Sequence, residues 1–98
     1  MKTTVKSNFP RALRRLRQAL GLAQEAFDVV SSRTYISSLE RGLKDPTVGK
    51  VEQLAAVMAV HPLTLLVLAY SDGSSGQVGR LLTQVEQEVR AALAAENH

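Results

Sequence analysis

The sequence contains no cysteine, so disulfide bonds and thiolate metal sites are excluded. This composition is consistent with a reducing compartment. Aromatic residues are also scarce, with two tyrosines, two phenylalanines and no tryptophan. Proteins that recognise single-stranded RNA stack its bases on patterned aromatic rings, and no such pattern occurs in this sequence. We therefore do not expect RNA recognition by base stacking.

Long hydrophobic segments are missing as well. No stretch approaches the roughly 18 consecutive apolar residues that a membrane-spanning helix requires. The N-terminal sequence MKTTVKSNFPRALRR becomes basic where a signal peptide would become hydrophobic. We therefore expect a cytoplasmic protein that does not bind a membrane.

Patterns of catalytic residues are absent too. The two histidines, His61 and His98, stand before a proline and at the last position of the chain. The motifs HExxH, GxSxG, GxGxxG and the P-loop do not occur. Glu86 and Glu88 fall on different faces of their predicted helix. We expect no enzymatic activity, no metal site and no cofactor.

The sequence does contain an uneven distribution of charge. Its 98 residues are enough for one domain with one core. Residues 1–50 hold ten basic and four acidic residues, a net charge of +6, whereas residues 51–98 hold two basic and five acidic residues, a net charge of −3. A basic half beside an acidic half favours a polyanionic partner for the first half, although a solvated basic helix has the same composition.

Signals for helices are strong, and signals for strands are weak. Pro10 suits the first turn of a helix, and Leu13, Leu16 and Leu20 follow at helical spacing. Gly21 ends this helix, because glycine readily adopts the left-handed conformation found after many helices. The sequence therefore predicts an all-α fold.

Four further helices are predicted between residue 24 and residue 70. A short helix runs from about residue 24 to 30, and another follows Ser32 over residues 33–41. A third helix begins after Thr47, and a fourth begins at Pro62. The residues predicted to be buried are Ala26 or Phe27, Ile36, Leu39, Val48, Val51, Leu54, Ala55, Met58, Leu65, Leu66 and Ala69.

The C-terminal part is predicted to be a separate element. The segment SDGSSGQVG, residues 71–79, is rich in serine and glycine and is typical of a linker between a domain of residues 1–70 and a tail of residues 80–98. A helix from about Arg80 to Ala95 should occupy most of the tail. Its apolar stripe consists of Leu82, Val85, Val89 and Leu93. This stripe either forms a dimer or covers the core of its own chain.

Two short helices around residues 24–30 and 32–41, joined by a tight polar turn, have the outline of a helix-turn-helix motif. The second helix of such a motif enters the major groove of DNA. Its predicted outward face carries Arg33, Thr34, Ser37 and Ser38. Arginine can donate to two acceptors of guanine, and serine or threonine can bond either kind of base edge. A plain amphipathic helix with a mild surface is the alternative.

A longer stretch, residues 13–66, strengthens the first interpretation. It reads LRRLRQALGLAQEAF…SSRTYISSLERGLKDPTVGKVEQLAAVMAVHPLTLL, and it resembles the Cro/phage-repressor (Xre-like) helix-turn-helix family. The resemblance rests on LR before the first glycine, QE at the second helix, YISxLERG in the recognition helix, the proline after the loop and LA in the fourth helix. It implies a five-helix lambda-repressor-like DNA-binding domain, followed here by a C-terminal helix. Such domains usually bind palindromic double-stranded DNA as homodimers.

The resemblance also assigns roles to individual residues. It implies that Arg17 and Glu40 form an ion pair between the first helix and the recognition helix. Tyr35 contacts phosphate or packs beneath the recognition helix, and the sequence leaves both open. The implied base contacts are Arg33, Thr34, Ser37 and Ser38, and the implied phosphate contacts are Gln24, Tyr35, Arg41 and Lys44. Further basic candidates for phosphate contacts are Arg11, Arg14 and Lys50.

Three features depart from the family pattern. Ala23 replaces the usual serine or threonine, so the second helix lacks a side-chain cap. Asp28 stands where a small alanine usually permits close helix contact. The segment from Gln24 to Ile36 is two residues shorter than the common pattern, with Val30 and Ser31 in place of the usual glycine turn. We interpret this as a shortened second helix, and a re-angled recognition helix is the alternative.

These observations predict a sequence-specific DNA-binding transcriptional regulator, a repressor, that acts as a homodimer. Residues 71–98 are too short for a ligand-binding domain, so no small-molecule ligand is expected. The alternative is an antitoxin-type protein that binds a partner toxin and regulates its own operon. In that case the C-terminal helix would bind the toxin.

Overall fold

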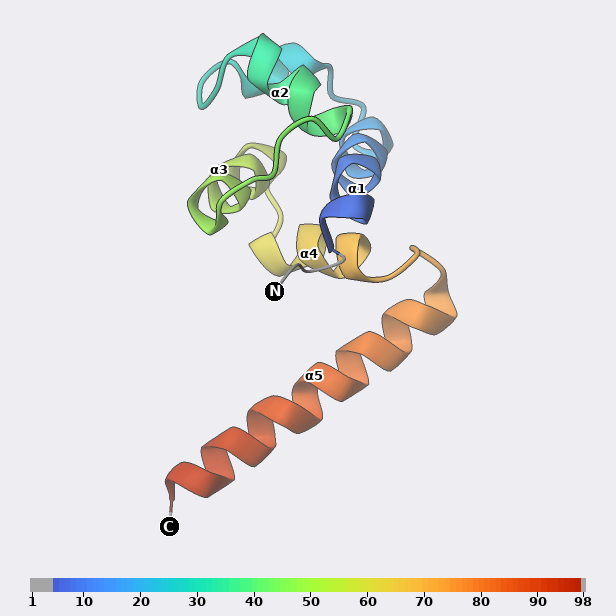
Figure 1. Ribbon diagram of the computed structural model, residues 1–98, viewed down its shortest axis with the longest axis vertical. Helices are drawn as coiled ribbons and strands as arrows, with labels where there is room; N and C mark the ends of the chain where they lie inside the picture. Colours follow the sequence, from blue (N-terminus) through green and yellow to red (C-terminus); the bar gives the residue numbers. More distant parts are fainter. Residues whose placement is uncertain (1–4, 98) are drawn as a thin grey trace.

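The computed structural model describes residues 5–97, and this part of the chain contains helices and no strand (Figure 1). The domain expected over residues 1–70 and the tail expected over residues 80–98 extend beyond the described residues at both ends. Residues 1–4, which include Lys2, and His98 lie outside them. The helical elements are α1 (Val5–Ala19), the 3-10 helix η1 (Gln24–Phe27), α2 (Arg33–Glu40), α3 (Val48–Met58), α4 (Pro62–Tyr70) and α5 (Ser75–Glu96). The all-α prediction is therefore confirmed.

Helices α1 to α4 and η1 surround one hydrophobic core. α1 packs most extensively against α4 and also against α2, while α3 packs against α4 and η1. The largest fully buried side chains come from every one of these elements. They are Leu13, Phe27, Ile36, Leu39, Leu54 and Leu65. A core shared by short helices holds each helix in place, because an isolated helix of this length is only marginally stable in water.

Local side chains determine where the helices begin and end. Ser32, Thr47 and Ser74 each accept a hydrogen bond from the backbone N–H three residues later, at 3.1 to 3.2 Å, and thereby cap α2, α3 and α5. Gly21 and Gly42 follow α1 and α2 with φ angles of 71° and 77°. These positive angles favour glycine and terminate both helices.

The second helix is shorter than expected. A helix over residues 24–30 was predicted, but η1 ends at Phe27 and is followed by a turn. Ala23 makes no side-chain cap, so this element lacks the hydrogen bond that usually begins such a helix. Val48 also differs from expectation: it opens α3 on the solvent side and is 75% exposed rather than buried.

A hydrogen-bonded turn, here called the elbow (residues 71–74), replaces most of the expected linker. The expected linker ended at residue 79, but α5 already begins at Ser75. Ser71 is buried, and its Oγ donates to the carbonyl of Val67 at 2.7 Å and accepts from the N–H of Gly73 at 3.2 Å. The physical reason for the earlier helix start is the cap that Ser74 provides.

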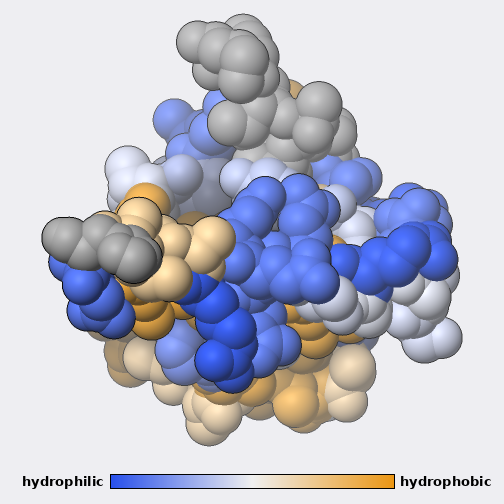
Figure 2. Space-filling model, turned by 90° about the horizontal axis from the view of Figure 1, so that it is seen from below, coloured by the Kyte–Doolittle hydropathy of each residue, from blue (hydrophilic) through white to orange (hydrophobic). Residues whose placement is uncertain are grey.

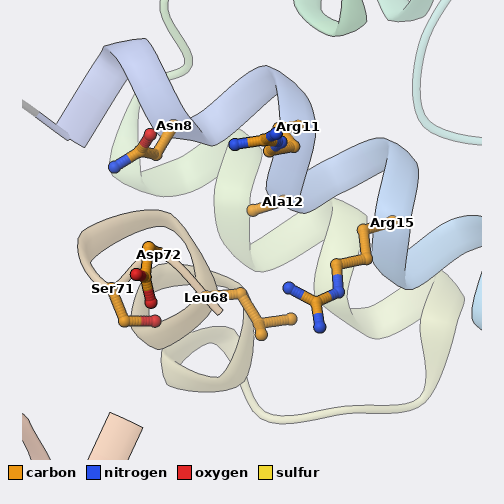
Figure 3. A pocket seen from close by; sticks show the side chains of 7 residues that line it. All are labelled: Asn8, Arg11, Ala12, Arg15, Leu68, Ser71 and Asp72. Carbon is orange, nitrogen blue, oxygen red and sulfur yellow. The ribbon is translucent and has the colours of Figure 1, made fainter. Parts of the chain in front are cut away.

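Arg15 connects the elbow to α1. Its Nη2 donates to the carbonyl of Gly73 at 3.3 Å. Figure 3 shows Arg15 extending from α1 toward the segment that carries Leu68, Ser71 and Asp72. Gly73 has a φ angle of 83°, and a Cβ at this position would overlap the Arg15 guanidinium. These contacts orient the start of α5 relative to the four-helix core.

Helix α5 leaves the core and projects away from it (Figure 1). None of its described residues is buried. Its apolar stripe is half exposed, with fractions of 50% for Leu82, 42% for Val85, 52% for Val89 and 55% for Leu93. Figure 2, seen from the end toward which α5 points, shows hydrophobic surface exposed beside hydrophilic surface. The stripe therefore does not cover the core of its own chain.

Among residues 5–97, no single helix is long and apolar enough to cross a bilayer. α3 and α4 pass that test only as a pair, and they are bent by 111° relative to each other.

Candidate nucleic-acid interface

Helix α2 has one buried and one exposed face. Ile36 and Leu39 are fully buried, whereas Arg33, Thr34 and the following Arg41 are exposed. This division follows from the helical period of 3.6 residues, which brings residues 33, 34, 37 and 41 to one side.

Ser38 does not lie where the sequence analysis expected it. Its side chain was assigned to the outward face, but Ser38 is only 7% exposed. Its position lies one step beyond Ser37 around the helix, which turns it toward the core side. The expectation that Ser38 faces outward is wrong, and its burial leaves little surface for a base contact.

Five polar side chains line one shallow hollow on the outside of the motif. We call it the reading surface. It consists of Gln24, Arg33, Thr34, Ser37 and Arg41. Gln24 comes from η1, and the others come from α2 and its C-terminal end. The structure thus brings together four of the predicted DNA contacts on α2 with one from the preceding element.

A bidentate ion pair holds α2 against α1. Nε of Arg17 donates to Oε2 of Glu40 at 2.7 Å, and Nη2 donates to Oε1 at 2.9 Å. The side chains are 11% and 4% exposed. The remaining Nη1 of Arg17 donates to the carbonyl of Leu22 at 2.9 Å. The hydrogen bond with Glu40 raises the pKa of Arg17, although burial acts in the opposite direction.

Gln24 joins this network. Its Nε2 donates to Oε1 of Glu40 at 3.1 Å. The contact ties η1 to α2, so the buried carboxylate of Glu40 holds three elements together. A glutamine amide has two N–H donors, so one remains for another acceptor such as a phosphate oxygen.

Tyr35 packs at the edge of the core. It is half-buried against the hydrophobic cluster. Nζ of Lys50 lies 5.3 Å from the centre of its ring and donates to the carbonyl of Val30 at 3.0 Å. The ring therefore packs against the core on the inner side of α2, and a phosphate contact by its hydroxyl stays a prediction.

A second hollow lies beside the reading surface, and we call it the basic groove. Its basic side chains are Arg11 and Arg14 of α1, with Arg41 and Lys44 after α2. All four are exposed. Arg41 lines both hollows, so the two lie next to each other on the surface. Four cations beside several hydrogen-bonding side chains match the chemistry of a DNA backbone beside base edges.

Arg33 has two acidic neighbours that sequence reasoning missed. Its Nη2 lies 3.6 Å from Oε2 of Glu25 and 3.9 Å from Oδ2 of Asp28. All three side chains are more than half exposed. The spacing of Glu25 and Asp28 could have predicted this pair of acidic neighbours, since residues three apart share one face of a helical turn.

Within residues 5–97, no group of three or more histidine, cysteine, aspartate or glutamate side chains is arranged to hold a metal ion.

Comparisons with known proteins point to the same motif. The family model described as helix-turn-helix matches residues 13–65, more than half of the chain. A relative from Sinorhizobium fredii (strain NBRC 101917 / NGR234), named as the uncharacterized HTH-type transcriptional regulator y4dJ, is 41% identical over 68 residues. The match covers 67% of this chain and 83% of that protein. No solved structure matches.

The matched residues contain the second half of α1, η1, α2, α3 and the start of α4, and hence the reading surface and most of the basic groove. From the sequence match and the arrangement of α2, this chain belongs to the Cro/phage-repressor (Xre-like) helix-turn-helix family of DNA-binding transcriptional regulators.

Proposed function

We propose that the protein is a sequence-specific repressor that binds a palindromic operator in double-stranded DNA as a homodimer. α2 enters the major groove, and Arg33, Thr34 and Ser37 contact base edges. Gln24, Arg41 and Lys44 contact phosphates, together with Arg11 and Arg14.

The observation that carries this proposal is that the reading surface and the basic groove adjoin at Arg41, which lines both. Base-reading groups need flanking cations, because phosphate contacts fix the register of a protein on the duplex while base contacts supply specificity. Arg33 is the strongest candidate for specificity, since an arginine can donate to both O6 and N7 of guanine.

The dimer part of the proposal rests on α5. A single α2 reads only a few base pairs, and a twofold dimer doubles the contacts on half-sites about 34 Å apart. The exposed stripe of Leu82, Val85, Val89 and Leu93 offers an apolar face for a second copy. Repression then follows from occupancy, because a dimer bound to the operator excludes other proteins from the same stretch of duplex.

The decisive experiment is selection of preferred duplexes from a random pool, followed by footprinting in the genome. The expected result is a palindrome whose half-sites lie one helical turn apart, or a multiple of this distance. Recovery of no preferred sequence would contradict the proposal.

The antitoxin-type module is the second candidate, and the exposed stripe of α5 also supports it. The purified protein alone distinguishes the two, because a homodimer forms without any other chain. A monomer at micromolar concentration, with a stable complex only in the presence of the neighbouring gene product, would favour the toxin-binding role.

A further inference from the structure

We propose that Glu25 and Asp28 determine specificity by holding Arg33 in position for base reading and by keeping phosphates away from it. Glu25 and Asp28 contact Arg33 rather than the DNA, so they are positioning residues. This inference rests on the proposed function, since it requires Arg33 to read a base.

The geometry lets Arg33 contact a base while Glu25 and Asp28 hold its side chain. Both carboxylates approach the same nitrogen, Nη2, at 3.6 and 3.9 Å. A guanidinium carries five N–H donors, and its two bidentate edges each use one of the two N–H groups of Nη2, so one edge stays available for a base when the carboxylates occupy the other. The two carboxylates come from η1 and from its C-terminal cap, and this one-sided approach limits the directions available to the Arg33 side chain.

The electrostatics favour bases over phosphates at this corner of the reading surface. Two carboxylates facing one guanidinium leave an excess negative charge. The basic groove keeps an excess positive charge, because Arg11, Arg14, Arg41 and Lys44 outnumber Glu40 and Asp45 in its lining. A phosphate that approached Arg33 would also approach Glu25 and Asp28, and like charges repel. The acceptors of guanine are neutral, so the same carboxylates oppose them far less.

The fold does not need these ion pairs. Exposed pairs of this kind stabilise proteins only slightly, and all three side chains are more than half exposed. The position of α2 is already set by the Ser32 cap and by the buried Arg17–Glu40 pair. The contacts around Arg33 therefore affect binding more than folding.

The test compares Glu25→Gln, Asp28→Asn and the double variant with Glu52→Gln in the full-length protein. Glu52 is exposed on α3 and lines neither the reading surface nor the basic groove. Its substitution removes the same charge as Glu25→Gln, so it controls for net charge. The dissociation constants for the selected operator and for a random duplex are measured by fluorescence anisotropy at two salt concentrations.

The double variant should bind random duplex about three- to tenfold more tightly, from the usual strength of two exposed ion pairs. The ratio of operator to random affinity should fall by a similar factor. In a repeated selection, preference should weaken at the base step that Arg33→Ala also affects. A purely structural role would not change one base step alone.

An unchanged ratio in the double variant would overturn this inference. An equal gain in random binding by Glu52→Gln and Glu25→Gln, which each remove one negative charge, would overturn it as well, because net charge alone would then explain the effect. If the wild-type protein prefers no duplex at all, the proposed function itself fails. That outcome is visible before any variant is compared.

Discussion

Helices α1 to α4 and helix α5 use the same apolar residue types in opposite ways. Leu54 and Leu65 are fully buried, whereas Leu82 and Leu93 are 50% and 55% exposed. The difference arises because four short helices cross around one core, while α5 projects away from that core and, within residues 5–97, packs mainly against α4. The comparison shows that an apolar stripe on a helix predicts a buried face, but not whether the same chain or another one covers that face.

The same contrast holds for ion pairs. Arg17 and Glu40 are almost inaccessible to solvent and bind in a bidentate geometry, whereas Arg33 and its acidic neighbours are exposed and more than 3.5 Å apart. A buried pair leaves an uncompensated charge when one partner is removed, and an exposed one is screened by water. The first should therefore support folding, and the second should affect recognition.

The largest effect is expected from placing a charge in the α5 stripe. If the proposed dimer forms through α5, Val85→Glu should convert it to a monomer, because each copy would lose an apolar contact worth at most about 1.5–3 kcal/mol, and a twofold dimer contains that contact twice. Analytical ultracentrifugation measures the change. Gln87→Glu adds the same charge at an exposed polar position and should leave the dimer intact. A Val85→Glu protein that remains dimeric would place the interface in α1–α4.

The next effect is expected in the core domain. Glu40→Ala should lower the free energy of unfolding by about 3–5 kcal/mol, because Arg17 would stay buried without its partner. Thermal denaturation followed by circular dichroism measures the loss. A double-mutant cycle with Arg17→Ala should show strong coupling, and additive effects would contradict a direct energetic link. DNA binding should weaken as well, since Glu40 also holds Gln24.

A smaller effect is expected at the reading surface. Arg33→Ala should weaken operator binding by about 1–3 kcal/mol and remove preference at one base step. Lys44→Ala should instead weaken all duplexes alike and reduce the slope of log K against log salt by about 0.9. Equal losses on random and specific DNA for Arg33→Ala would contradict its role as a base contact.

The smallest effect is expected at the elbow. Hydrogen bonds from the backbone and side chain of Ser74 lower the pKa of Asp72, so the charged carboxylate favours the folded elbow. This stabilisation is present above the ordinary aspartate pKa and is lost as the pH falls through the lowered value. The amide resonance of Ser74 should shift during acidification and should stay constant in Asp72→Asn. Identical titration in both proteins would exclude this contact.

The sequence by itself predicted the features that depend on local spacing. The helical period identified α2, α4 and the second half of α1, and the hydroxyl groups of Ser32 and Thr47 identified where α2 and α3 begin. The expected start of α1 was wrong, because the helix begins at Val5 and Pro10 lies inside it rather than in its first turn. The resemblance of residues 13–66 to a known family supplied the Arg17–Glu40 pair. Spacing was sufficient here because helix periodicity and capping act over only a few residues.

Only the tertiary structure decided the features that depend on distant neighbours. It buried Ser38, exposed Val48 and shortened the second helix to one turn of 3-10 helix. It also tied the elbow to the core, because Arg15 of α1 reaches Gly73 across 58 positions of the sequence. Helical periodicity assigns a residue to a face of its helix, but the packing of other helices decides whether that face meets the core, solvent or another chain.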